Sequence, residues 1–140
     1  ITDANTGDIN LGGTYSAGTI SGGTVYPSRG LSLDAGNKVA KIDLLGGQAI
    51  DLTDREVTGS MQLELTAAQE VTFYSEVNAN TLTSVSFEHG TAAGAKVLFH
   101  APNVQRVNPK HTDYEGRIHH TFDLRCLPTT GNDDLRIVVL

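Results

Sequence analysis

Residues 117–127, RIHHTFDLRCL, decide the fold class of this chain because they alternate between two kinds of side chain. One face carries the more apolar set: Ile118, His120, Phe122, Leu124 and Cys126. The other face carries Arg117, His119, Thr121, Asp123 and Arg125. A repeat of two residues is the period of a β-strand with one face on the core. The stretch therefore predicts a half-buried strand whose polar face is free for contact.

Other segments predict further strands. Residues 56–65 place Val57, Met61, Leu63 and Leu65 on one face and polar groups on the other, which is again a period of two. Residues 81–89 and 96–101 flank the flexible sequence GTAAGA and predict a β-hairpin. Residues 41–45 and 49–52 bracket Gly46-Gly47 and predict a second, shorter hairpin. Residues 135–140, after a polar turn, predict the last strand.

Two prolines interrupt this pattern. Pro102 and Pro109 bound residues 103–108, and proline cannot donate to a strand ladder. This stretch is therefore expected to lie at a sheet edge or in a loop.

One segment predicts a helix. Thr66 and Gln69 fit a capping box, in which each side chain satisfies a free backbone N–H of the other residue. Ala67, Val71, Tyr74 and Val77 follow at helical spacing, which predicts a short amphipathic helix over residues 67–78. The β-branched and aromatic residues between Val71 and Tyr74 oppose this prediction.

The chain length of 140 residues indicates one domain. Residues 1–30 space their glycines among Thr and Ser, which predicts a flexible N-terminal arm or loop, with short edge strands as the alternative. Residues 31–140 are expected to form the domain itself. The predicted fold is mainly β, an antiparallel β-sandwich or partial barrel with one short flanking α-helix.

Composition excludes several function classes. The net charge is −6 and no run of Lys or Arg occurs, which opposes tight binding to phosphate backbones. No apolar run reaches the roughly 20 residues of a membrane helix, so no membrane association is expected. Cys126 is the single cysteine and lies on the apolar face of its strand, so we interpret it as a buried, inert thiol.

The sequence offers no catalytic or metal-binding constellation, so we expect no enzyme, no metal and no cofactor. His119 and His120 are adjacent and point to opposite faces of a strand, so they cannot chelate one ion. His89 and His100 lie on facing arms of the predicted hairpin but lack a third ligand. Neither a nucleophile motif of the type GxSxG nor a phosphate-binding GxxxxGK[ST] loop is present.

From about Asp51 onward the sequence resembles a known protein family. Residues 54–60 (DREVTGS) lead into a strand, Gly90-Thr91 and Gly94 lie in a hairpin, and VQRVNP is bounded by proline. With residues 113–116 and the closing TFDLRCLPTTGNDDLRIVV, the chain resembles the tail tube (major tail) proteins of long-tailed bacteriophages. The resemblance implies like modules in rings of six that stack into a hollow tube for DNA passage. It also implies either a single module or one module of a longer or duplicated chain.

The resemblance leads to our functional hypothesis, a structural, self-assembling virion protein. Its partners would be other copies of itself, other phage tail proteins, and DNA that passes without specific binding. It would be assembled in the bacterial cytoplasm and end in the virion tail. The hairpin of residues 81–101 and the N-terminal arm are the segments expected to order on neighbouring copies.

Candidate residues follow from this hypothesis. The predicted subunit-contact set is Arg117, His119, Thr121, Asp123, Arg125, His89 and His100. The acidic residues predicted to face the lumen are Asp43, Asp51 and Glu64. The alternative function is a non-catalytic β-sandwich binding module for carbohydrate or cell-surface adhesion, with Tyr15, Tyr26 and Tyr114 as the aromatic groups available for sugar.

Overall fold

The computed structural model describes residues 3–140. It is mainly β with antiparallel pairing throughout and one flanking helix, as predicted. The elements in chain order are η1 (Asp3–Asn5), β1 (Ile9–Leu11), β2 (Thr14–Ser16), β3 (Thr19–Ser21), β4 (Thr24–Tyr26), β5 (Ser28–Asp34), β6 (Asn37–Leu44), β7 (Gly47–Arg55), β8 (Thr58–Leu63), α1 (Ala67–Asn78), β9 (Thr83–His89), β10 (Val97–Tyr114), β11 (Arg117–Cys126) and β12 (Arg136–Val139).

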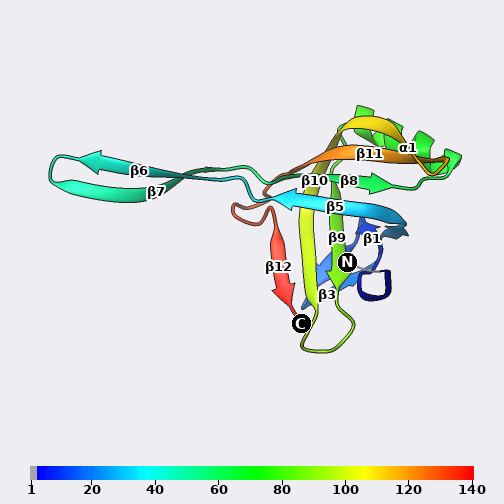
Figure 1. The fold of residues 1–140 in the computed structure, drawn as a ribbon, viewed down its shortest axis with the longest axis horizontal. Coiled ribbons are helices and arrows are strands. Elements are labelled where there is room, and N and C mark those ends of the chain that lie inside the picture. Colours follow the sequence, from blue (N-terminus) through cyan, green and yellow to red (C-terminus); the bar gives the residue numbers. More distant parts are fainter. Residues whose placement is uncertain (1–2) are drawn as a thin grey trace.

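One large sheet forms the body, in the order β4-β1-β9-β10-β11-β8-β5, with β12 also paired to β10. The first part of β10 pairs with β9 and β12, and its second part pairs with β11. In Figure 1 the strands β9, β10 and β12 run vertically, while β5, β8 and β11 cross above them. Within the described residues the ladder ends at β4 and β5, so the barrel stays open.

The segment bounded by the two prolines is a strand at an edge, which is one of the two predicted alternatives. It is the centre of the 18-residue strand β10, and beyond Val104, which pairs with both Thr83 and Cys126, its partners lie on β11 alone. The register shifts between Ala101 and Val104 and again between Val107 and Lys110. Pro102 and Pro109 each fall within one of these irregularities, where the ladder does not require their missing N–H.

The first thirty residues carry four short strands. β1 joins the main sheet between β4 and β9, and its residues Ile9 and Leu11 are buried in the core. β2 and β3 pair only with each other. The segment expected to be a flexible arm or loop thus contributes to the body of the protein.

The helix lies where it was predicted, over Ala67–Asn78, with both hydrogen bonds of the Thr66–Gln69 capping box present. Its buried residue is Phe73, whereas Val71, assigned to the apolar face, is 72% exposed. The larger Phe73 ring sets the docking direction because it contacts Tyr26 and Phe122, with centroid distances of 5.2 and 5.6 Å.

The core lies under this helix and between the bent parts of the sheet. Its members come from β1, β8, β9, β10 and β11 and from the segments beside them: Ile9, Leu11, Val57, Met61, Leu63, Phe73, Val85, Ala101, Val104, Phe122, Leu124 and Cys126. Phe122, Leu124 and Cys126 confirm the apolar face read from residues 117–127. Ile118 on that face is 63% exposed because it lies near the end of β11, beyond the core.

Candidate functional site

The polar face of β11 was the first candidate surface. Three of its charged residues have partners within the chain: Arg117 lies 2.9 Å from Glu64, Arg125 lies 2.7 Å from Glu56, and Asp123 accepts a hydrogen bond from Asn108 at 2.9 Å. The Thr121 and Thr112 hydroxyls are 3.1 Å apart. His119 is only 5% exposed and packs edge-on against Tyr114. Much of the stripe is therefore engaged within its own subunit.

The two hairpin histidines do not meet. His89 pairs with Val97 and His100 pairs with Ser86, three positions further along the same hairpin. An odd separation puts their side chains on opposite faces of the sheet. The Nδ1 of His89 lies 2.8 Å from the Thr6 hydroxyl, and the buried ring of His100 stacks on Tyr15. Neither pairing leaves the two imidazoles near one ion.

The three acidic residues also lie apart. Asp43 and Asp51 both belong to the β6–β7 hairpin, but Asp43 pairs with Gln48 and Asp51 with Ala40. Since side chains alternate along each strand, these two carboxylates point to opposite faces of the hairpin. Glu64 follows β8 and is bound to Arg117. The structure does not bring the three carboxylates to one surface.

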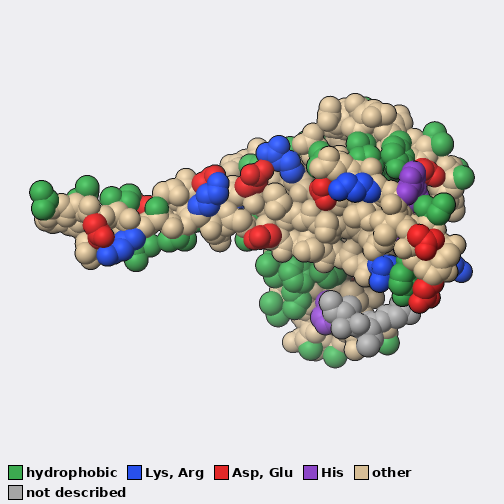
Figure 2. Space-filling view, turned by 45° about the horizontal axis from the view of Figure 1, so that its top comes forward, with side chains coloured by type: hydrophobic (Ala, Val, Ile, Leu, Met, Phe, Trp, Pro, Cys, Tyr) green, Lys and Arg blue, Asp and Glu red, His purple; other side chains and the backbone are tan. Residues whose placement is uncertain are grey.

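A larger surface lies on the β6–β7 hairpin, which Figure 1 shows extending away from the body. β6 and β7 form a separate two-stranded sheet, and none of residues 37–54 is buried. Leu44 is 71% and Ile50 74% exposed. The exposed apolar residues of this hairpin are Val39, Ile42, Leu44, Leu45, Ile50 and Leu52. Figure 2 shows hydrophobic side chains distributed over the projection.

Sequence reasoning predicted this hairpin but not its exposure. A strand that keeps one face on a core alternates apolar and polar residues, whereas residues 39–52 place apolar groups on both faces. That pattern is normally a sign of burial on both sides. In the single chain the hairpin lies in solvent, which indicates that its apolar side chains contact another chain.

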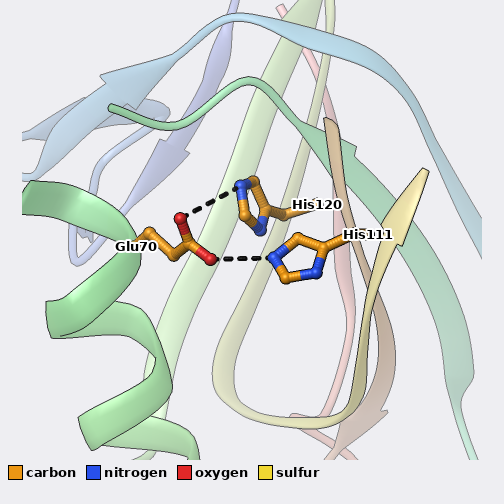
Figure 3. A group of neighbouring side chains, drawn as sticks. All are labelled: Glu70, His111 and His120. Carbon is orange, nitrogen blue, oxygen red and sulfur yellow. Dashed lines mark hydrogen bonds and ion pairs between the residues drawn. The ribbon is translucent and has the colours of Figure 1, made fainter. Parts of the chain in front are cut away.

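A second site joins the helix to the sheet. Glu70 lies in the first turn of α1, while His111 and His120 are direct cross-strand partners on β10 and β11. The Nε2 of His111 is 2.8 Å from one Glu70 carboxylate oxygen, and the Nε2 of His120 is 3.9 Å from the other. Figure 3 shows the carboxylate pointing toward both rings. One ligand atom from each residue lies within 4.8 Å of the other two.

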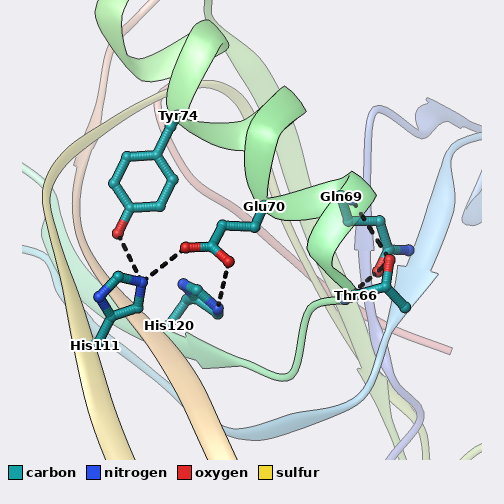
Figure 4. A network of polar contacts seen from close by, with 6 residues as sticks. All are labelled: Thr66, Gln69, Glu70, Tyr74, His111 and His120. Atoms are coloured by element: carbon teal, nitrogen blue, oxygen red, sulfur yellow. Dashed lines mark hydrogen bonds and ion pairs between the residues drawn. The ribbon is translucent and has the colours of Figure 1, made fainter.

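The environment of the two histidines differs. His120 is 2% exposed, its Nδ1 has no hydrogen-bond partner, and burial lowers its pKa below the usual value. His111 is exposed at the surface, and the Tyr74 hydroxyl lies 3.4 Å from its Nε2. Figure 4 shows Glu70 and Tyr74 descending from the same helix face, with the capping pair Thr66–Gln69 at the helix start.

Sequence reasoning missed this site because it considered His120 only beside His119. A signal was available in the turn at Glu115-Gly116, where both residues have positive φ. A two-residue hairpin turn between Tyr114 and Arg117 fixes the register of the strands on either side. Counting back from it places His111 opposite His120. The position of Glu70 depends on how the helix docks and has no such signal.

The tyrosines considered for sugar binding and the single cysteine are engaged by other parts of the chain. Arg29 lies 3.6 Å from the ring centroid of Tyr114, and Arg136 lies 4.4 Å from that of Tyr15. Tyr26 contacts Phe73 in the core. Each of the three tyrosines considered for sugar binding thus has a side-chain contact within its own chain, although Tyr114 remains 37% exposed. Burial and the nearby Asp134 raise the pKa of the Cys126 thiol to about 11, so the thiolate is scarce at neutral pH.

Among the described residues, no helix has the length and apolar character needed to cross a membrane.

A family model matches the chain, and several solved structures are similar to it, two of which follow. A family model described as "Phage tail tube protein" matches residues 1–126. No curated protein sequence matches the chain significantly. The sheath/tube terminator of the extracellular contractile injection system PVC, in its extended state, is similar over 100% of this chain and 96% of its own, with a TM-score of 0.62 and 8% identity.

The baseplate of the anti-feeding prophage (AFP), a 6-fold symmetrised structure, contains a chain that is similar over 94% of this chain and 91% of its own. Its TM-score is 0.58 at 10% identity. At these identities the two likenesses establish the fold alone.

Proposed function

The chain belongs to the phage tail tube protein family, and we propose that it assembles with copies of itself into stacked rings that form the tube through which DNA passes. Membership makes it a structural component of a tail. Beyond family membership, we propose that the protein forms rings, that the rings stack, and that they contact other tail proteins. Assembly would take place in the bacterial cytoplasm, before incorporation into the virion. Catalysis has no part in it.

The observation that carries the proposal is the β6–β7 hairpin. An isolated two-stranded hairpin is marginally stable in water, yet this one extends from the body with six large apolar side chains exposed. Exposed apolar surface gathered on one element in this way indicates a site of protein–protein contact. The occupant that fits best is a second copy of the chain, because a tube is built from repeated subunits.

The polar residues take secondary roles in this proposal. Arg117 and Arg125 remain exposed although each is paired with a carboxylate of its own chain. Such exposed pairs can exchange partners with a neighbouring copy at small cost, through either isologous or head-to-tail packing. Asp43 and Asp51, on opposite faces of the hairpin, place one carboxylate toward the lumen whichever face turns inward.

Passage of DNA without specific binding is supported by the charge distribution. The net charge is −6, and at least seven of the ten Lys and Arg side chains are paired with carboxylates. Few cations are therefore left to release counterions from phosphates, which is the main source of affinity for DNA. A polyanion would slide past such a surface.

The test compares two double variants of the hairpin by sedimentation velocity and electron microscopy of concentrated protein. I50S/L52S removes two exposed apolar side chains from one face of the hairpin. Q48S/T53S changes two polar residues of the same strand to serine and is the matched control. We expect rings or tubes from the wild type and from Q48S/T53S, and monomers from I50S/L52S with an unchanged melting temperature.

Two results would contradict the proposal in different ways. A wild-type protein that stays monomeric at every concentration would overturn self-assembly. Equal assembly by wild type and I50S/L52S would leave self-assembly in place but remove the hairpin from the contact.

A further inference from the structure

We propose that Glu70, His111 and His120 form a binding site for one zinc ion that ties helix α1 to strands β10 and β11. The three side chains come from distant parts of the sequence and converge where the helix covers the sheet (Figure 3). The assembly role proposed above neither requires this site nor predicts it, so the two proposals can fail separately.

The donor set is the first argument. Two imidazole nitrogens and one carboxylate oxygen suit zinc, which takes four ligands in a tetrahedral arrangement. Hard cations such as Mg²⁺ and Ca²⁺ prefer sites made of oxygen alone. A set of three protein ligands leaves a fourth position for water. The exposure of His111 gives that position access to solvent.

The geometry is the second argument. With bonds of about 2.0–2.1 Å, two ligand atoms on one tetrahedral zinc lie about 3.4 Å apart. The two observed distances between Glu70 oxygens and histidine nitrogens are 2.8 and 3.9 Å, on either side of that value. All three ligand atoms lie within 4.8 Å of one another, so zinc binding requires side-chain rotations that bring the widest pair closer by up to about 1.4 Å. The cross-strand pairing of His111 with His120 already fixes the two rings beside each other, with centroids 4.8 Å apart.

The unsatisfied state of His120 is the third argument. Its side chain is 2% exposed, its Nδ1 has no hydrogen-bond partner, and its Nε2 lies 3.9 Å from a Glu70 oxygen. A buried polar group without a partner costs free energy. The carboxylate oxygen at 3.9 Å is too distant for a hydrogen bond but faces Nε2. A zinc ion between the two atoms satisfies both.

The surroundings add support. The Tyr74 hydroxyl, 3.4 Å from Nε2 of His111, is placed to hydrogen-bond a zinc-bound water. The competing interpretation is a Glu70–His111 ion pair above a core histidine, which needs no metal. The two interpretations differ in what added zinc does.

The experiment uses the full chain, stripped with a chelator and then freed of it, and titrates ZnCl₂ by calorimetry and by thermal melting. We expect one zinc per chain and a melting temperature raised by roughly 8 °C at a hundredfold excess over Kd. MgCl₂ at the same concentrations leaves the melting temperature unchanged. Co²⁺ in place of zinc gives the visible absorption bands of a tetrahedral site.

Three variants separate the site from incidental binding. H111Q removes an exposed ligand without disturbing the core, and E70Q removes the carboxylate charge; each is expected to weaken zinc binding at least a hundredfold while the far-ultraviolet circular dichroism stays native. H89Q, which removes a histidine outside the cluster, is the control and keeps wild-type affinity. Zinc binding that is equal in wild type and H111Q, or no binding by the wild type, overturns the proposal.

Discussion

His100 links the charge of one buried side chain to the stability of the fold. It is 5% exposed, its ring stacks on Tyr15, and Arg136 lies over the same tyrosine. Burial, and to a lesser extent the nearby Arg136, lower the pKa of His100 below its ordinary value of 6.5. The neutral ring is therefore the form that the folded state favours.

The direction of the pH effect follows from linkage. Because the pKa is lower in the folded state, the unfolded chain binds the proton first as pH falls. The stability that depends on neutral His100 is fully present above about pH 7 and is lost as pH falls through 6.5 toward the folded pKa. We expect H100F, which keeps an aromatic ring, to lose less stability than wild type between pH 7 and pH 5. Urea unfolding at a series of pH values measures this, and parallel curves for the two proteins would rule it out.

Single residues also show what the sequence can and cannot reveal. The burial of Phe122, Leu124 and Cys126 follows from strand alternation. The burial of His119 does not, because its alternating position marks it as outward-facing while Tyr114 on the neighbouring strand covers it. The partnership of His120 with Glu70 depends on helix docking, which no local pattern encodes. Alternation of polar and apolar residues identifies the two faces of a strand. The elements that pack on each face determine which of its side chains are buried.

At the scale of elements, helix α1 begins at a capping box. The backbone N–H of Gln69 donates to the Thr66 hydroxyl, and the backbone N–H of Thr66 donates to the Gln69 side chain at 2.9 Å. These bonds satisfy two N–H groups that a helix start leaves free. The helix also contacts the sheet through an ion pair between Glu76 and the buried Arg106.

We expect T66A to lower the free energy of unfolding by about 1 kcal/mol, the usual effect of removing a Ser or Thr cap. T72A is the control, because Thr72 lies within the same helix, is exposed, and donates only to the Ala68 carbonyl one turn earlier. Chemical denaturation followed by circular dichroism compares the two. Equal losses in T66A and T72A would mean that the capping bonds contribute little.

The sequence predicted most elements because their signals are local. The capping box, the Gly46-Gly47 turn and the alternation in residues 56–65 each determine nearby backbone geometry. At β10 the prolines indicated an edge or a loop, and the residues between Val104 and Pro109 do pair with β11 alone. The length of β10 was not predicted, because two register shifts let the strand continue past both prolines.

For the whole molecule, the body and the β6–β7 hairpin are separable. None of residues 37–54 is buried, and the hairpin pairs only with itself. Arg55 at its base contacts Asp134 at 2.9 Å and belongs with the body. The core therefore needs no side chain of the projection.

Replacing residues 38–54 with the turn Asn-Gly is expected to shift the melting temperature by no more than about 3 °C, because no buried side chain is removed. The shortened protein should also remain monomeric at concentrations where the wild type assembles. Differential scanning calorimetry and sedimentation velocity give the two readouts. A large loss of stability would mean that the hairpin supports the body in the isolated subunit.

Strand spacing and the capping box predicted the overall architecture, but the exposure of the apolar hairpin could not be predicted from residues 37–55 alone. A stretch with apolar groups on both faces is equally compatible with a strand buried between two layers. Only the arrangement of the complete chain shows that the remaining elements cover neither face.

The position of β1 in the main sheet predicts the order in which the strands form during folding. β10 and β11 are joined by a two-residue turn, whereas Asn10 of β1 pairs with Ser86 of β9, far along the chain. Closing so long a loop carries an entropic cost that is repaid only when the partner strand already exists. We therefore expect the C-terminal strands to form first, and β1 to be the last strand to dock and the first to detach.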